Sequence, residues 1–179
     1  MNTKIKIVTA SPEDASILGY IQSETWLNCY INKEQAISKA DIQAKVDEWN
    51  QQGDIRIKSE MQKSNAYTWV AKDADQIVGF VAGLKELKQN HIEALHVLPQ
   101  YQGKGIGTAL LKTVLDWLGD EKPIVIEVVA YNLNAQEFYK KHGFNLAGEA
   151  LNDPIVLPSG KSISKVLMIR HNLNNLTIH

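Results

Sequence analysis

The segment that most constrains this chain runs from residue 96 to residue 111, where an apolar strand-like stretch ends at Pro99 and a long apolar helix follows. Three glycines separate the two at alternate positions, Gly103, Gly105 and Gly107. Because glycine has no Cβ, its backbone can approach a ligand closely. The first turn of a helix carries unpaired N–H groups and a partial positive charge, which favour an anion. A strand, a glycine loop and a helix in this order therefore predict a phosphate-binding site.

The composition is that of an ordinary globular protein. Its 179 residues are 44% apolar and 22% charged, which suits one domain with a hydrophobic core. With 19 basic against 20 acidic residues the net charge is −1, so the sequence predicts neither a nucleic-acid partner nor a membrane partner. Cys29 is the only cysteine, which excludes an internal disulfide and argues against a cysteine-based metal site. The N-terminal residues lack a signal-peptide core and no run reaches transmembrane length, so we expect a cytoplasmic location.

Hydrophobic periodicity predicts an α/β fold. The middle of the chain indicates an antiparallel meander of three strands, followed by a strand–helix–strand unit with the spacing of a right-handed parallel crossover. Residues 54–65 fit no single pattern, and residues 152–161 are predicted to form a loop. The expected strands are 4–8, 67–72, 77–84, 92–98, 123–130, 144–149 and 164–170, and the expected helices are 12–30, 40–52, 107–119 and one that begins near residue 134.

The last of these helices has clear start and stop signals. Asn134 followed three residues later by Glu137 is a capping-box arrangement, with Leu133 and Phe138 at the staple positions. Gly143 stands where a left-handed residue ends a helix. We therefore predict Asn134 as the N-cap of a short helix in a defined place.

Three interpretations of the glycine loop compete. A nucleoside-triphosphate P-loop requires Gly, four residues and then Gly-Lys-Ser/Thr, a spacing that is absent around Gly103. A dinucleotide-binding fingerprint requires a third glycine where this chain has Thr108. The acid at the expected distance, Glu127, falls inside a strand, and the preceding strands look antiparallel. A dinucleotide oxidoreductase is thus a remote alternative.

The third interpretation is a resemblance to a family. Gln102-x-x-Gly105-x-Gly107 resembles the Q/R-x-x-G-x-G/A motif of the GCN5-related N-acetyltransferases, the GNAT superfamily. The stretch Asn132-x-x-Ala135-x-x-Phe138-Tyr139-x-Lys141-x-Gly143-Phe144 is similar to the second signature of that family. The order of elements matches over nearly the whole chain. The resemblance implies a single GNAT domain over residues 1–172, with a mixed, mostly antiparallel central sheet flanked by helices, and a polar tail at residues 173–179.

The resemblance also implies acetyl-CoA as the cosubstrate and no metal. The strand end at Leu95, His96 and Val97 is then expected to pair with the pantetheine arm, and Asn132 to contact that arm. The pyrophosphate is expected on the backbone N–H groups of Gln102, Gly103, Lys104, Gly105, Ile106, Gly107 and Thr108.

The same resemblance makes Tyr139 the acid that protonates the departing thiolate. A tyrosine pKa near 10 matches an alkyl thiol, so the proton transfer is close to thermoneutral. An attacking ammonium must first lose a proton, and the sequence offers Glu127 and then Glu93 as candidate bases, each with a purely structural alternative. His91 and His96 are weaker candidates.

The reaction implied is direct attack of a primary amine on the acetyl thioester. Small-molecule amines such as a polyamine or an amino-acid derivative, and protein amines, are all expected acceptors. Trp26 and Tyr30 are candidates for the acceptor side, with core packing as the alternative. The rival from another class is a CoA-binding regulatory module without turnover. Homodimers are common among relatives, and the oligomeric state is left open.

Overall fold

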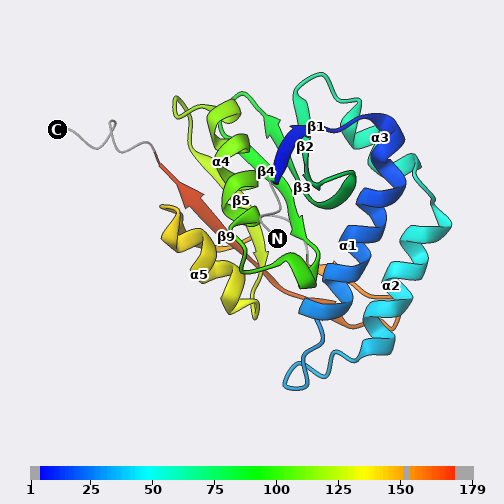
Figure 1. The fold of residues 1–179 in the computed structure, drawn as a ribbon. Helices are drawn as coiled ribbons and strands as arrows, with labels where there is room; N and C mark the ends of the chain where they lie inside the picture. Colours follow the sequence, from blue (N-terminus) through cyan, green and yellow to red (C-terminus); the bar gives the residue numbers. More distant parts are fainter. Residues whose placement is uncertain (1–4, 151–153, 172–179) are drawn as a thin grey trace.

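The chain forms one seven-stranded sheet, in a computed structural model that describes residues 5–150 and 154–171 (Figure 1). Its strands are β1 (Lys6–Thr9), β2 (Ala66–Asp73), β3 (Gln76–Lys85), β4 (Asn90–Val97), β5 (Ile124–Val129), β6 (Asn145–Glu149) and β9 (Lys165–Arg170). They lie in the order β1-β2-β3-β4-β5-β9-β6, and every neighbouring pair is antiparallel except β4 and β5. The predicted mixed, mostly antiparallel sheet and its parallel crossover are confirmed.

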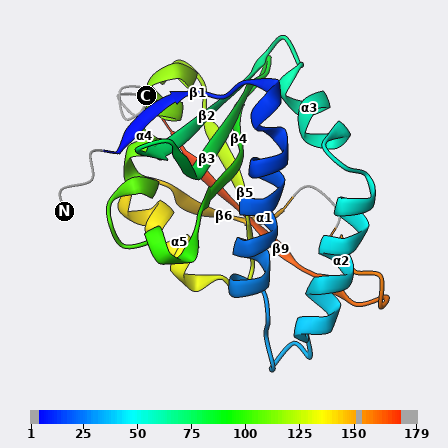
Figure 2. The ribbon, with the colours of Figure 1, turned by 45° about the vertical axis from the view of Figure 1, so that its right-hand side comes forward.

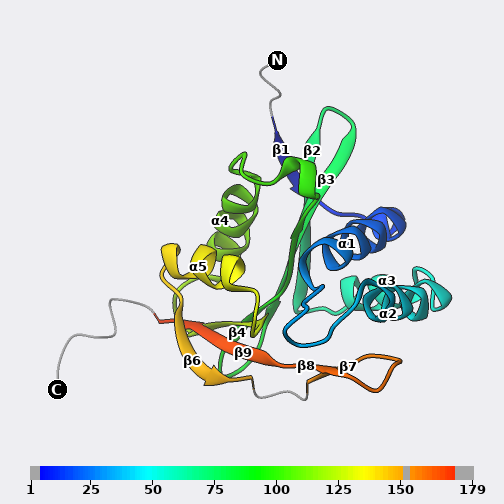
Figure 3. The same cartoon turned by 90° about the horizontal axis from the view of Figure 1, so that it is seen from below.

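Helices cover both faces of this sheet, as Figure 3 shows from below. One layer holds α1 (Ala15–Cys29), α2 (Lys39–Gln51) and α3 (Ile55–Met61), and the other holds α4 (Ile106–Leu118) and α5 (Leu133–Lys141). Short 3-10 turns precede α1 (η1, Pro12–Asp14) and the glycine loop (η2, Pro99–Tyr101), and β7 (Ile155–Val156) pairs with β8 (Ser162–Ile163) in a separate hairpin.

The core lies where α4 meets the sheet. Leu110, Leu111 and Val114 are fully buried on the apolar face of α4. Gly83 allows this close approach, because a Cβ there would lie 2.6 Å from Val114 Cγ2. On the opposite face, α1 runs across the strands (Figure 2) and buries Leu18 completely.

Strands β4 and β5 pair over only a short length. The register joins Asn90 with Ile124 and His91 with Val125, and then the two strands separate. A bulge at Glu93 shifts the register between β4 and β3, close to the point where β4 and β5 separate. In Figure 3, β9 and β6 turn away from β2 and β3. The separation leaves the C-terminal halves of β4 and β5 facing each other without backbone pairing.

The structure corrects two local predictions and assigns one segment that the sequence left open. The N-cap of α5 is Asn132 rather than Asn134, because the Asn132 side chain accepts a hydrogen bond from Ala135 N at 3.2 Å and starts the helix two residues earlier. Residues 54–65, left without an assignment, contain α3, and the predicted loop at 152–161 contains β7.

Other expectations hold or cannot be compared. The predicted helix start at Ser11 is confirmed by a capping box, in which Ser11 N donates to Asp14 Oδ2 at 2.8 Å. Asn152 and the predicted tail at 173–179 lie outside the described residues.

Candidate active site

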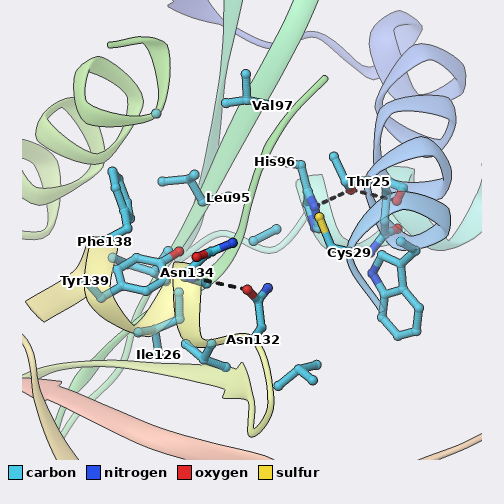
Figure 4. A pocket seen from close by; sticks show the side chains of 18 of the residues that line it. Thr25, Cys29, Leu95, His96, Val97, Ile126, Asn132, Asn134, Phe138 and Tyr139 are labelled. Carbon is cyan, nitrogen blue, oxygen red and sulfur yellow. Dashed lines mark hydrogen bonds between the residues drawn. The ribbon is translucent and has the colours of Figure 1, made fainter. Parts of the chain in front are cut away.

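A cleft of about 1090 Å³ opens where β4 and β5 separate (Figure 4). The glycine loop and α5 border it from one layer of helices, and the end of α1 borders it from the other. Its volume is at the upper end of small-molecule sites, which suits a large ligand together with a second reactant.

The β4 wall presents backbone groups to the cleft. Leu95, His96 and Val97 all line it, as the sequence placed them. Among the described residues no strand pairs with this edge of β4 beyond His91. Because an unpaired strand edge offers alternating N–H and C=O groups, it can bind an extended chain that carries amides.

The glycine loop lies at the end of that wall. Gly103 and Gly105 have φ values of +73° and +80°, a left-handed conformation that glycine adopts without strain, and Gly105 is the N-cap of α4. Gln102 Nε2 donates to Val97 O at 2.9 Å and thereby fastens the loop to the end of β4. The N–H groups of the first turn of α4 are left for an anion.

Not every predicted loop residue offers its side chain to the cleft. Lys104 Nζ lies 4.8 Å from the centre of the Tyr101 ring, and Ile106 is buried in the core. Neither residue lines the cleft, so their contribution there is limited to the main chain. Gly107 and Thr108 do line it, and a Cβ at Gly107 would make an ordinary 3.6 Å contact with Phe138.

The α5 side contributes Asn132 and Tyr139. The Asn132 Oδ1 atom caps the helix, which leaves the amide group for the cleft. Tyr139 is buried between Phe138 and Phe144, with ring centres at 5.2 and 5.6 Å. Burial, with a smaller effect of Tyr30, raises the pKa of the Tyr139 phenol, so the group is protonated and can act as a donor.

The two candidate bases stand in different environments. Glu127 accepts a hydrogen bond from Lys165 Nζ at 2.6 Å in a half-buried ion pair. Glu93 lies at the β4 bulge, and burial raises the pKa of its carboxyl group against the smaller opposing effects of His91 and Lys63. Both side chains line the cleft.

Aromatic side chains form the opposite wall. Trp26 and Tyr30 line the cleft and also pack into a buried cluster, so the core-packing alternative is confirmed and their role toward an acceptor stays a prediction. The Trp26 ring meets Tyr30 and Trp49 edge-on at 4.6 and 4.4 Å. Burial raises the pKa of Tyr30. Cys29 lines the same wall.

The sequence analysis missed one contact at this wall. Thr25 Oγ1 of α1 lies 2.8 Å from His96 Nδ1 of β4, across 71 positions of sequence (Figure 4). Burial first, and the charge of Arg56 second, lower the pKa of His96 to about 4. No local pattern signals such a contact, because it depends on how α1 packs on the sheet.

The sequence pattern of the "Acetyltransferase (GNAT) family" matches residues 34–144, more than half of the chain. The chain belongs to this family. Among its relatives are an uncharacterized N-acetyltransferase of Methanocaldococcus jannaschii, 35% identical over 42% of this chain and 51% of that protein, and N-acetyltransferase 8B of Rattus norvegicus, 29% identical over 74% of this chain and 56% of that protein. This GNAT chain thus spans about half the length of these curated relatives.

Solved structures share the fold of this GNAT chain. The PaiA N-acetyltransferase from Thermoplasma acidophilum, crystallised in complex with coenzyme A, superposes with a TM-score of 0.73 at 20% identity and covers 94% of this chain and 99% of its own. No helix among residues 5–150 and 154–171 is both long and apolar enough to cross a membrane. The same residues contain no group of three or more His, Cys, Asp or Glu side chains arranged to hold a metal ion.

Proposed function

We propose that this protein is an acetyl-CoA-dependent N-acetyltransferase that acylates a primary amine. The observation that carries the proposal is the continuity of two ligand-binding features. An unpaired edge of β4 runs directly into a left-handed glycine loop at the N-terminus of α4. Together they match an extended molecule with amide groups along its length and phosphates at one end.

The residues of the cleft fit acetyl-CoA in that orientation. The backbone of Leu95 to Val97 is suited to the amides of the pantetheine arm, and the N–H groups from Gln102 to Thr108 are suited to the pyrophosphate. The Asn132 amide reaches the cleft between them. Acetyl-CoA supplies an acetyl group activated as a thioester. The coenzyme A bound to the related PaiA fold supports this assignment.

Tyr139 is the proposed acid. A tyrosine already carries its proton at neutral pH, and burial raises the pKa of Tyr139 further, so its phenol is a proton donor that is weaker than the ordinary tyrosine matched to an alkyl thiol. We assign its proton to the sulfur of the leaving thiol. A positioned acid of this kind contributes about 10²–10⁴-fold in rate.

Glu93 is the proposed base, ahead of Glu127. Protonation of Glu127 would remove the negative charge that pairs with Lys165 Nζ. Glu93 lines the cleft and burial raises the pKa of its carboxyl group, which favours a proton acceptor, so we rank it first. The sequence analysis ranked these carboxylates in the reverse order.

The acceptor side is assigned to the wall of α1. Trp26 and Tyr30, at the end of α1, line the cleft, and aromatic rings bind an ammonium by cation–π attraction. The acceptors proposed are small-molecule amines, including polyamines and amino-acid derivatives, and protein amines.

Release of free thiol from acetyl-CoA, measured over a broad panel of amines, tests this function. We expect turnover with at least one class of amine, together with calorimetric binding of acetyl-CoA and CoA and none of NAD. Binding of acetyl-CoA without thiol release from any amine would instead support a regulatory module. Binding of NAD without CoA would overturn the assignment.

A further inference from the structure

The contact between Thr25 and His96 fixes which nitrogen of the imidazole carries a proton. Thr25 Oγ1 lies 2.8 Å from Gln22 O, a carbonyl oxygen that can only accept. The single hydroxyl proton is therefore committed to Gln22, and Oγ1 must accept from His96 Nδ1 at 2.8 Å. The neutral His96 ring is thus the Nδ1–H tautomer, with its lone pair on Nε2.

That lone pair is open to the cleft. Among the described residues, every side-chain nitrogen or oxygen atom that is inaccessible to solvent has a hydrogen-bond partner. Nε2 of His96 makes no hydrogen bond within this part of the chain. Nε2 must therefore reach open space, and the open space that His96 lines is the cleft. In Figure 4 the ring lies between the β4 wall and α1.

The charge next to His96 keeps the ring neutral. Arg56 donates a hydrogen bond to Gln22 Oε1, and Thr25 Oγ1 donates one to the main-chain oxygen of Gln22. Gln22 of α1 therefore binds both the Arg56 guanidinium and the Thr25 hydroxyl. Burial and this cation lower the pKa of His96 to about 4. At neutral pH the ring consequently offers an uncharged hydrogen-bond acceptor.

We propose that His96 Nε2 accepts a hydrogen bond from the N–H of the acceptor amine, and that Thr25 is the positioning residue that holds the ring in the required tautomer. This inference rests on the proposed acetyltransferase function and deepens it, because it assigns the group that recognises the acceptor. The selected feature of the substrate is a nitrogen that donates a hydrogen bond. Backbone pairing of His96 with the pantetheine arm is a separate role and leaves the ring available.

The tautomer can be observed without any substrate. In protein labelled with ¹⁵N-histidine, long-range ¹H–¹⁵N correlations should show a protonated Nδ1 and an unprotonated Nε2 for His96, assigned by comparison with His96→Phe. Thr25→Val should move this residue toward the opposite tautomer. An Nε2–H tautomer in the unmodified protein would overturn the proposal.

Kinetics with the best amine of the panel test the contact itself. We expect Thr25→Val to raise the KM for that amine about fivefold and His96→Phe about tenfold, the loss of one hydrogen bond, while the Kd for acetyl-CoA changes less than twofold. Thr25→Ser, which keeps the hydroxyl, should restore the tautomer and the amine KM. Ser23→Ala is the matched control, because Ser23 Oγ makes a similar bond to Gly19 O on the same helix but does not contact His96.

The outcomes separate this inference from the proposed function. Thiol release by the unmodified protein with an unchanged amine KM in both Thr25→Val and His96→Phe would overturn the role of His96 and leave the acetyltransferase intact. Equal losses in Ser23→Ala and Thr25→Val would show a purely structural role. Absence of thiol release in the unmodified protein would overturn the function, while the tautomer would still be measurable.

Discussion

The two walls of the cleft are built on different principles. On the side of α4 and α5, the groups suited to a ligand are main-chain atoms, fixed by the β4 edge and by left-handed glycines. On the side of α1, they are side chains, held by an aromatic cluster and by the contact between Thr25 and His96. Main-chain recognition tolerates many sequences, whereas side-chain recognition can change with one substitution. The first wall therefore suits a ligand common to a family, and the second suits a ligand particular to one member.

Tyr139→Phe gives the largest expected effect and tests the proposed acid, a side chain on the α5 side of the cleft. Removal of the phenolic hydroxyl should lower kcat by about 10²–10³-fold, because the leaving thiolate loses its proton donor. The Kd for acetyl-CoA should stay within about twofold. Steady-state kinetics with calorimetry measures both, and an unchanged kcat over the full pH range would remove Tyr139 from the acid role.

Glu93→Gln should lower kcat/KM by at least about tenfold and remove the acid limb of the pH–rate profile. The sign follows from the raised pKa of Glu93, because only the carboxylate accepts a proton and activity must rise as the pH passes that pKa. Glu127→Gln is the comparison variant. Loss of the acid limb in Glu127→Gln alone would instead assign the role of base to Glu127.

Gly105→Ala should weaken acetyl-CoA binding by about tenfold, because a left-handed conformation costs a residue with a Cβ about 1–3 kcal/mol. Gly160→Ala is a matched control. Gly105 and Gly160 have φ values of +80° and +81°, and a Cβ at either would meet nothing within 4 Å. Both variants should lose stability equally, and only Gly105→Ala should lose affinity in calorimetry. Equal affinities would contradict main-chain recognition at the loop.

Asp41→Asn has the smallest expected effect and tests the packing of α2 and the β7–β8 hairpin behind the side-chain wall. Lys161 Nζ of the β7–β8 hairpin lies 2.8 Å from Asp41 Oδ2, and this bond, with those of Ser159 and Ser38, holds the pKa of Asp41 well below its usual range. We expect Tm at pH 7 to fall by about 2–4 °C, with no change in acetyl-CoA affinity.

The pH dependence of that Tm difference has a definite sign. Because the folded pKa of Asp41 is depressed, its stabilisation is present above the ordinary aspartate pKa and is lost as the pH falls below it. The difference in Tm between Asp41→Asn and the unmodified protein should therefore disappear at acidic pH. Asp47→Asn, at an exposed residue that bonds only to Gln43 on the same helix, should show no such difference.

The main-chain wall could largely be predicted from the sequence, whereas the side-chain wall could not. Alternate glycines before an apolar helix define the loop between β4 and α4 by local conformation alone. The side-chain wall depends on contacts between distant segments, such as Thr25 with His96 and Asp41 with Lys161, which leave no periodic pattern.

One local error and one segment without a prediction have separate causes. The capping-box pattern favoured Asn134, but a single side-chain bond from Asn132 was sufficient to start α5 earlier. Helix α3 escaped prediction because it is seven residues long and contains no fully buried residue, so hydrophobic periodicity carried little signal.

The short pairing of β4 with β5 has a thermodynamic consequence. Only two residue pairs join β4 and β5 by backbone pairing in the described part of the chain, so a ligand that hydrogen-bonds along β4 supplies contacts that a neighbouring strand provides elsewhere in the sheet. Such a ligand is in effect an additional strand, and its binding free energy becomes part of the folding free energy. By linkage, a cosubstrate present at 100 times its Kd adds about 2.7 kcal/mol to the stability of the fold. The resting stability of this protein should therefore depend partly on the concentration of any ligand that binds along β4.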